Sequence, residues 1–278
     1  MRLRNVAHMI REIDTLPVLP ETAQRVREAM TDLKSSVSDV AEIIVMDPPI
    51  AAKVLSVANS AAFGFPNRVD DLTLAVTLLG LRETYGIVLS CSVLNLFDSS
   101  PCFDYKAFWV EAMMCAAAAR IVAKASGLRG QFGVFPAGLL HDIGRVALAE
   151  VARQAYSQVD HSLPPSELVA EEERVVGLSH AEAGYALAQH WELPPAIAEP
   201  IRFHHNPGLA TEARQNVAIV ALADVMAVAV GSEIDENERL FDGYEDELAL
   251  LELDMEVAEA MLQDFLNKRD ISLRDALD

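Results

Sequence analysis

The segment GLLHDIGR, residues 138–145, places two chemically useful side chains, His141 and Asp142, at the end of an apolar run. Burying an ionisable pair is costly unless its members pair with each other or bind a metal ion. An imidazole nitrogen together with a carboxylate is a donor set that suits divalent metal ions. The dipeptide alone favours a helix cap or a cross-link between helices, because it is common, so a metal site requires further ligands.

Asp224 is the first further candidate, since it interrupts the apolar run VAIVALADVMAVAV, which predicts a buried helix. A carboxylate in such a helix must find hydrogen bonds or a cation. His180 opens the segment SHAEAGYALAQHW, for which Ser179 is the expected N-cap. Its ring either points into the same cavity as His141 or only caps the helix at the surface, and the pattern favours neither.

His204 and His205 precede Pro207 and are expected to end a helix. Adjacent residues of a helix point about 100° apart. We therefore expect the two rings to take neighbouring roles and not to serve one ion together.

The remaining polar candidates have simpler interpretations. Arg145 lies one helical turn beyond His141, so the two can share a face and Arg145 can steady a phosphate. A surface salt bridge explains Arg145 slightly better. His190 beside Trp191 is assigned to packing, and His161 and His8 are expected to be solvated.

The elements that must position these side chains read as helices along almost the whole chain. Apolar residues recur at spacings of three and four residues, which is typical of helices. No segment alternates polar and apolar residues over a sustained stretch, so we expect an all-α protein with essentially no sheet. Ser38 or Asp39 can cap one early helix. Residues 72–97 predict one long apolar helix or two helices broken near Gly80 or Gly86.

Composition narrows the class of protein. The chain has 278 residues, half of them hydrophobic, and a formal net charge of −20, which argues against nucleic acid as a partner. Residues 233–278 carry 16 acidic and 4 basic residues and predict a helix with a charged outer face. Such a face most simply keeps the protein soluble, and a surface for a basic partner is the weaker alternative.

Neither a membrane nor an oxidising compartment is indicated. The first residues contain no long apolar core, and the most apolar stretch, 217–230, is short and interrupted by Asp224. Cys91, Cys102 and Cys115 are odd in number and lack CxxC spacing, as expected for reduced, packed cysteines. We therefore expect a cytoplasmic protein with no membrane partner.

An ordered set of short motifs resembles the HDOD proteins, which are bacterial signalling relatives of the HD-domain phosphohydrolases. Each motif is weak alone, but the ordered set covers about 210 residues. The motifs, in chain order, are LPVLP at 16–20, IIVMDPPIAAKVLSVANSAAFG with Asp47, Pro48, Ala58, Asn59 and Ser60, LTLAVTLLGL, FW at 108–109, GLLHDIGR, SHAEAGYALAQHWELP, FHHNP and ALAD.

The resemblance implies two packed all-helical lobes, the C-terminal one similar to an HD domain. We expect an N-terminal lobe at 1–100, an HD-like lobe at 101–232 and an acidic helical extension at 233–278, with the boundary between the lobes in the polar segment 98–105. The N-terminal lobe carries no obvious chemistry. It would supply a surface for partner proteins, with the Asn59 and Ser60 turn involved, unless these two residues only stop a helix.

The resemblance also implies a ligand set for a divalent metal, which would be Fe, Mn, Ni, Zn or Mg. His141, Asp142 and Asp224 match the His-Asp pair and the last Asp of active HD hydrolases. The extra His ligands of the binuclear HD-GYP enzymes are matched by His180, His204 and His205.

This chain departs from the family pattern at two places. The first His of the HD pattern should follow FW by two residues, where this chain has Glu111. Glu ligates hard cations but is not the usual residue there. The Gly-Tyr-Pro motif of the cyclic-dinucleotide phosphodiesterases is absent after HHNP.

Two hypotheses follow for what such a chain does. In the favoured one, it regulates through contacts with signalling proteins such as a sensor kinase, a response regulator or a cyclase, and keeps a residual metal site. In the alternative, it is a metal-dependent phosphohydrolase in which Asp142 and Arg145 have catalytic roles and the ion activates a water molecule. A third, intermediate case is a metal, phosphate or nucleotide bound as a structural or sensory ligand without turnover.

Overall fold

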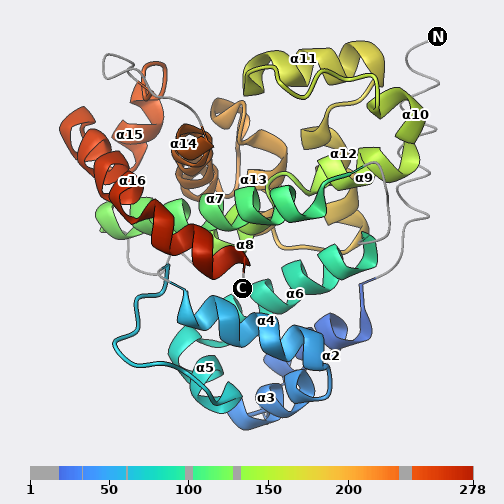
Figure 1. Cartoon of the computed structure of the whole chain (residues 1–278), viewed down its shortest axis with the longest axis vertical. Helices are drawn as coiled ribbons and strands as arrows, with labels where there is room; N and C mark the ends of the chain where they lie inside the picture. Colours follow the sequence, from blue (N-terminus) through green and yellow to red (C-terminus); the bar gives the residue numbers. More distant parts are fainter. Residues whose placement is uncertain are drawn as a thin grey trace.

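The computed structural model describes residues 19–32, 34–60, 62–97, 103–127, 133–231 and 240–277. Within these ranges the chain forms helices and no strand, so the all-α prediction is confirmed (Figure 1). His8, Cys102 and residues 98–101 and 233–239 of the expected boundary and acidic segments lie outside the described residues.

Within the described ranges, five helices form the N-terminal part of the molecule, which lies at the bottom of Figure 1. Helix α6 packs against α2 and α4, while α3 packs against α5. Their apolar stripes, among them Val26, Ile44 and Val54, are fully buried in the core shared by the two parts of the chain. These helices are α2 (Glu21–Thr31), α3 (Val37–Val45), α4 (Pro48–Asn59), α5 (Leu72–Leu79) and α6 (Leu81–Phe97).

Two local details settle alternatives left by the sequence pattern. The cap of α3 is Ser36, not Ser38 or Asp39: the Ser36 hydroxyl accepts from the Asp39 N–H, and the Asp39 carboxylate accepts from the Ser36 N–H. This capping box satisfies two backbone donors at once. The 72–97 segment breaks at Gly80, whose φ of 84° is readily adopted only by glycine.

The turn after α4 uses its polar side chains internally. The Asn59 amide accepts from the Val69 N–H at 2.8 Å and donates to the Val69 carbonyl at 2.7 Å. The Ser60 hydroxyl is buried and donates to the Val57 carbonyl. Both residues therefore hold the loop that follows α4. This internal role agrees with the expectation that they stop the helix, and it does not require a partner protein.

The C-terminal part is built around α7 (Tyr105–Ala125), which packs against α8, α14 and α16. Its Ala-rich buried face lets these neighbouring helices approach closely. The other helices are α8 (Val134–Leu140), α9 (Ile143–Val151), α10 (Arg153–Tyr156), α11 (Pro165–Val175), α12 (His180–His190), α13 (Pro195–Phe203), η1 (Pro207–Leu209), α14 (Arg214–Gly231), α15 (Glu245–Leu250) and α16 (Met255–Leu277).

The acidic C-terminal segment forms α15 and α16, which lie over α7 and α14 (Figure 1). Phe241, Leu251 and Phe265 are buried there in a second apolar core shared with α7 and α14. Helix α16 also touches α4 and so links the two parts of the chain. Its acidic residues Glu256, Glu259 and Asp264 are exposed, as an amphipathic helix requires.

Two glycines bring α9 and α12 into backbone contact. A Cβ atom added to Gly144 would lie 1.8 Å from the His180 carbonyl oxygen and 2.6 Å from the Gly184 nitrogen. No side chain other than hydrogen fits at Gly144, so this glycine sets the distance between the start of α9 and the start of α12. Those two helix starts carry Asp142 and His180.

Among the described residues, no single helix is both long and apolar enough to cross a membrane. One pair, Leu72–Leu79 with Leu81–Val93, reaches the required length and composition together, but it is bent by 114°.

Candidate metal centre

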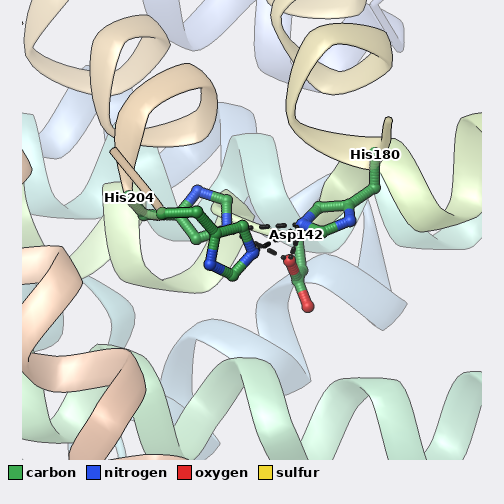
Figure 2. A group of neighbouring side chains, drawn as sticks. Asp142, His180 and His204 are labelled. Atoms are coloured by element: carbon green, nitrogen blue, oxygen red, sulfur yellow. Dashed lines mark hydrogen bonds and ion pairs between the residues drawn. The ribbon is translucent and has the colours of Figure 1, made fainter. Parts of the chain in front are cut away.

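Six of the seven proposed metal ligands gather at one place in the C-terminal part. Figure 2 shows the centre of this group, where the rings of His180 and His204 face the Asp142 carboxylate. The ligand atoms fall into two sets, each within 4.8 Å, and these six residues are called the His/Asp cluster below. One set is Asp142, His180, His204 and His205, and the other is His141, His204 and Asp224.

Helix ends supply most of the cluster. His141 follows the last residue of α8, and Asp142 is the N-cap of α9 but makes no side-chain cap bond. Its carboxylate is therefore available to the cluster. His180 is the first residue of α12, with Ser179 as its cap as predicted, His204 and His205 follow α13, and Asp224 lies inside α14.

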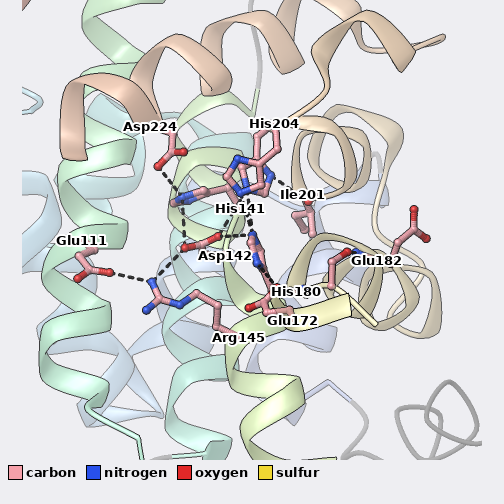
Figure 3. A network of polar contacts seen from close by, with 12 residues as sticks. Glu111, His141, Asp142, Arg145, Glu172, His180, Glu182, Ile201, His204 and Asp224 are labelled. Carbon is pink, nitrogen blue, oxygen red and sulfur yellow. Dashed lines mark hydrogen bonds and ion pairs between the residues drawn. The ribbon is translucent and has the colours of Figure 1, made fainter. Parts of the chain in front are cut away.

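Asp142 lies between the two sets, because its two carboxylate oxygens face different rings (Figure 3). Its Oδ1 is 3.2 Å from the His180 Nε2 and 3.5 Å from the His204 Nε2. Its Oδ2 is 3.8 Å from the His141 Nε2, and the Asp224 Oδ1 lies 3.3 Å from that same nitrogen. A carboxylate placed in this way can serve either set or both.

Three of the rings present the same nitrogen to the cluster because the other nitrogen is held by the protein. The Nδ1–H of His141 donates to the Gly138 carbonyl at 2.7 Å, and that of His204 donates to the Pro200 carbonyl at 3.0 Å. The Nδ1–H of His180 donates to the Glu172 carboxylate at 2.7 Å. A carbonyl only accepts, so these bonds place a hydrogen on Nδ1 and leave Nε2 to bind a cation.

His204 and His205 converge, contrary to the expectation that adjacent residues take separate roles. Their ring centroids are 4.0 Å apart, and the His180 Nε2 lies 3.4 Å from the His204 Nε2 and 3.0 Å from the His205 Nε2. The expectation was wrong because it used ideal helix geometry. Helix α13 ends at Phe203, and the His side chains are long enough to turn toward one point beyond the helix end.

The electrostatics follow from burial and mutual contact. Burial acts to lower the pKa of His180, but the Asp142 and Glu172 carboxylates raise it above its usual value. Burial likewise opposes protonation of His141, yet Cys115, Asp142 and Asp224 raise its pKa well above the usual range.

The pKa values of Asp142 and His205 are lowered. Burial acts to raise the pKa of Asp142, but the His141 and His180 rings outweigh it and hold that pKa well below its usual value. The pKa of His205 falls to about 2 through burial and the charges of His204 and His180. The cluster therefore contains ionised carboxylates and a neutral His205 ring at neutral pH.

Glu172 is a functional candidate that the sequence reasoning missed. Its side chain is fully buried, and its Oε2 accepts both from the His180 ring and from the His180 backbone N–H at 2.7 Å. The available signal was its place in α11: Glu172 lies four residues from Leu168 and four from Val176, both buried. A carboxylate on an apolar helical stripe needs a partner, as Asp224 does.

A Glu172→Gln protein is expected to keep its fold and to bind a divalent metal about 10- to 100-fold more weakly. The amide is the same size, but it no longer provides the negative charge that orients the His180 ring and increases its basicity. Metal titration by calorimetry measures the change. Glu171→Gln is the control, since Glu171 pairs with the exposed Arg174, and equal affinities for the two variants would contradict the role of Glu172.

Glu111 and Arg145 lie beside the His/Asp cluster and not within it. The Glu111 side chain is 59% exposed, and its Oε2 accepts from the Arg145 Nη1 at 3.0 Å. The same Nη1 is 3.2 Å from the Asp142 Oδ2. The structure thus does not bring Glu111 into either ligand set, because its carboxylate is paired with Arg145 at the mouth of the site (Figure 3).

A cavity of about 420 Å³, called the metal-site cavity, opens over the cluster. Its lining includes Asp142, Arg145, His180 and Asp224, and also His161. His161 is exposed as predicted, but its ring packs on Tyr156 at 4.8 Å and forms part of the rim. The size is within the range of small-molecule sites.

An all-helical domain with a His-Asp pair between two helices and further His and Asp residues facing it belongs to the HD-like class of folds. The chain belongs to the HDOD domain family, whose model matches residues 16–207. A curated relative is an uncharacterized protein of Treponema pallidum (strain Nichols), 30% identical over 220 residues. The match covers 77% of this chain and 42% of that protein, so this chain spans less than half of the relative's length.

Solved structures share the fold. An HDOD domain protein of unknown function from Geobacter sulfurreducens superposes with a TM-score of 0.76 at 24% identity, covering 95% of this chain and 97% of the other. A provisionally named phosphohydrolase from Shewanella amazonensis SB2B superposes with a TM-score of 0.73 at 24% identity, and the match covers 97% of this chain and 98% of the other. A provisionally named signal transduction protein from Marinobacter aquaeolei VT8 superposes with a TM-score of 0.73 at 22% identity, and the match covers 99% of this chain and 65% of the other.

Proposed function

We propose that this chain is a metal-binding HDOD module of signal transduction that acts through contacts with other proteins. The observation that supports metal binding best is the convergence of three imidazole Nε2 nitrogens and a carboxylate oxygen at Asp142. Ring nitrogens that face one another with their lone pairs repel unless a proton or a cation lies between them. The geometry therefore suits a cation, which would displace any proton held between the rings.

The donor set fits a divalent metal. Imidazole nitrogens suit Zn, Fe, Ni and Mn, and carboxylates extend the range to Mg. Asp142, His180, His204 and His205 would hold one ion, or His141, His204 and Asp224 would hold it, since the one free nitrogen of His204 serves one set at a time. When bound, such an ion would supply Lewis-acid polarisation of a phosphoryl oxygen and activation of water.

Signalling is favoured by the relatives and by the departures of this chain from active hydrolases. The Marinobacter structure with this fold is provisionally named a signal transduction protein. In this chain the first His of the HD pattern is replaced by Glu111, and Glu111 pairs with Arg145. One ligand position of the hydrolase pattern is thus directed away from the cluster, which weakens the case for turnover.

A phosphohydrolase is the second candidate, because the metal-site cavity places an arginine directly beside the ligand set. Arg145 would hold a phosphate oxygen through its guanidinium, and Asp142 would hold the ion and keep Arg145 in place. A panel of phosphomonoesters, nucleotides and cyclic dinucleotides with Mn²⁺ tests this role. Turnover no faster than that of Asp142→Ala excludes it.

Two experiments test the favoured proposal. Elemental analysis of protein purified without chelator should find stoichiometric Mn, Fe, Ni or Zn. A pull-down should recover a sensor kinase, response regulator or cyclase, and replacing His141 and Asp142 by Ala should leave that binding intact. A metal-free protein even after incubation with excess Mn²⁺ or Fe²⁺ would remove the metal from the proposal. Recovery of no protein above background would remove the signalling contact.

Metal affinity is expected to rise as the pH increases through the raised pKa values of His141 and His180. Because the pKa values of His141 and His180 are raised, these rings hold a proton to a higher pH than an ordinary His does in the metal-free protein. A metal ion must displace each such proton, so affinity should rise by about one log unit per pH unit for each proton released. Calorimetric titrations in buffers of different ionisation enthalpy count the protons, and a pH-independent affinity with no proton release would contradict this.

A further inference from the structure

A second cavity, called the side cavity, adjoins the metal-site cavity. Three residues line both of them, namely Glu111, Arg145 and His161. The side cavity has a volume of about 210 Å³ and lies between the start of α7 and the helices α9 and α10. The two spaces therefore lie next to each other, with the paired Glu111 and Arg145 side chains in the wall of each.

The side cavity differs from the metal-site cavity in its chemistry. Its walls include the aromatic rings of Phe103, Phe108 and Tyr156 and the methyl groups of Ala107 and Ala149. Phe108 and Tyr156 are almost fully buried, so these walls are firmly packed. A cavity of roughly 150 Å³ with apolar walls holds benzene. The side cavity thus accommodates one ring-sized organic group and is too small for a large ligand.

Arg145 lies in the wall of both cavities and is paired with two carboxylates. Its Nη1 contacts Glu111 and Asp142, as Figure 3 shows. A guanidinium offers donors in a planar fork that matches phosphate oxygens. Arg145 is therefore the group in the lining of both cavities that suits a phosphate.

We propose that the two cavities together bind a phosphate monoester of a flat, ring-sized group, with the phosphate at Arg145 and the ring in the side cavity. The inference rests on the proposed function and extends it, since it names the ligand of that site, whether the ligand is sensed or hydrolysed. The walls favour a ring over a second phosphate, because the other cation in the lining, Arg153, is already paired with Glu150.

Glu111 has a defined part in this arrangement. Its pair with Arg145 is exposed on the Glu111 side, and such pairs contribute little stability. A phosphate dianion can therefore replace the Glu111 carboxylate at Arg145. A ligand with less negative charge competes less well with Glu111 and should bind more weakly. The residue that departs from the family pattern becomes a determinant of ligand choice.

The test compares phenyl phosphate with methyl phosphate, which carry the same phosphate but differ in the ring. Calorimetric titrations use the full chain in one metal state, with Mn²⁺ where Mn²⁺ binds and without metal otherwise. We expect wild-type protein to bind phenyl phosphate at least ~10-fold more tightly, as burial of a ring-sized apolar group allows. Ala107→Leu, which fills the side cavity from an exposed helical position, should largely abolish this preference and leave methyl phosphate affinity unchanged.

Ala170→Leu is the matched control, because Ala170 is an exposed helical alanine that lines neither cavity. A crystal structure of the wild-type complex supplies a second readout that requires no variant, namely the ring beside Phe103 and Tyr156. Equal affinities for the two esters, a preference that survives Ala107→Leu, or no binding of either ester would overturn the proposal. Elemental analysis measures metal binding separately. A failure of the phosphate ester proposal can therefore be distinguished from a failure of the metal proposal.

Discussion

Replacing Asp142 and Asp224 together by Ala is expected to reduce bound metal from stoichiometric amounts to background. Asp142 faces both ligand sets, and Asp224 belongs to the second set, so the variant removes every carboxylate that the two sets contain. The loss in affinity should exceed about 100-fold, beyond the effect of losing an outer hydrogen-bond partner. Elemental analysis and calorimetric titration with Mn²⁺ and Zn²⁺ measure it.

The control must remove the same charge elsewhere. Asp70→Ala with Asp246→Ala does so at two exposed positions and should leave metal content unchanged. Circular dichroism checks that both double variants are helical. If the Asp142 and Asp224 variant keeps its metal, the His/Asp cluster is not the site, and the carboxylates serve only to neutralise buried His rings.

The Gly144→Ala variant should produce the largest loss of stability among single substitutions in the C-terminal part. The new methyl group would meet the His180 carbonyl and the Gly184 nitrogen, which are backbone atoms and cannot rotate away. Helices α9 and α12 must then separate, which should cost about 3 kcal/mol or more of the free energy of unfolding. Denaturant unfolding measures this, with the midpoint shifting and the slope nearly constant.

The same separation moves His180 away from Asp142, so the folded fraction of Gly144→Ala should also bind metal more weakly. Gly208→Ala is the control, because a Cβ at Gly208 meets no atom within 4 Å and its φ is not positive. A Gly144→Ala protein with unchanged stability would show that α9 and α12 do not pack as closely as their backbone contact indicates.

Much of the helical organisation could be predicted from local patterns. The apolar spacing predicted helices throughout, Ser179 was identified as the cap of α12, and a break at Gly80 was one of the alternatives for residues 72–97, beside a break at Gly86 and one unbroken helix. Caps and glycine breaks depend on residues within one or two turns, so they can be inferred without the tertiary structure. The cap of α3 was misplaced because three neighbouring residues were all able to provide it.

The residues of the candidate site could be predicted only in part. His141, Asp142 and Asp224 could be identified because each is an ionisable residue in or at the end of an apolar run, and the order of the family motifs supported them. The pairing of Glu111 with Arg145 had no such signal, since it joins α7 and α9 across 34 residues. Glu172 was missed because its partner, His180, lies on another helix, and only packing shows that this carboxylate is buried against the ring.

The amino-acid sequence by itself determined the helical class, the family and the residue types available to hold a metal. These follow from periodicity and short motifs, which are properties of neighbouring residues. Only the tertiary structure decided which nitrogen each His presents, that His204 and His205 converge, and that the side cavity meets the cluster at Arg145. The reason is physical: these features depend on the packing of helices that are distant along the chain, and packing at Gly144 sets the distance between two of them.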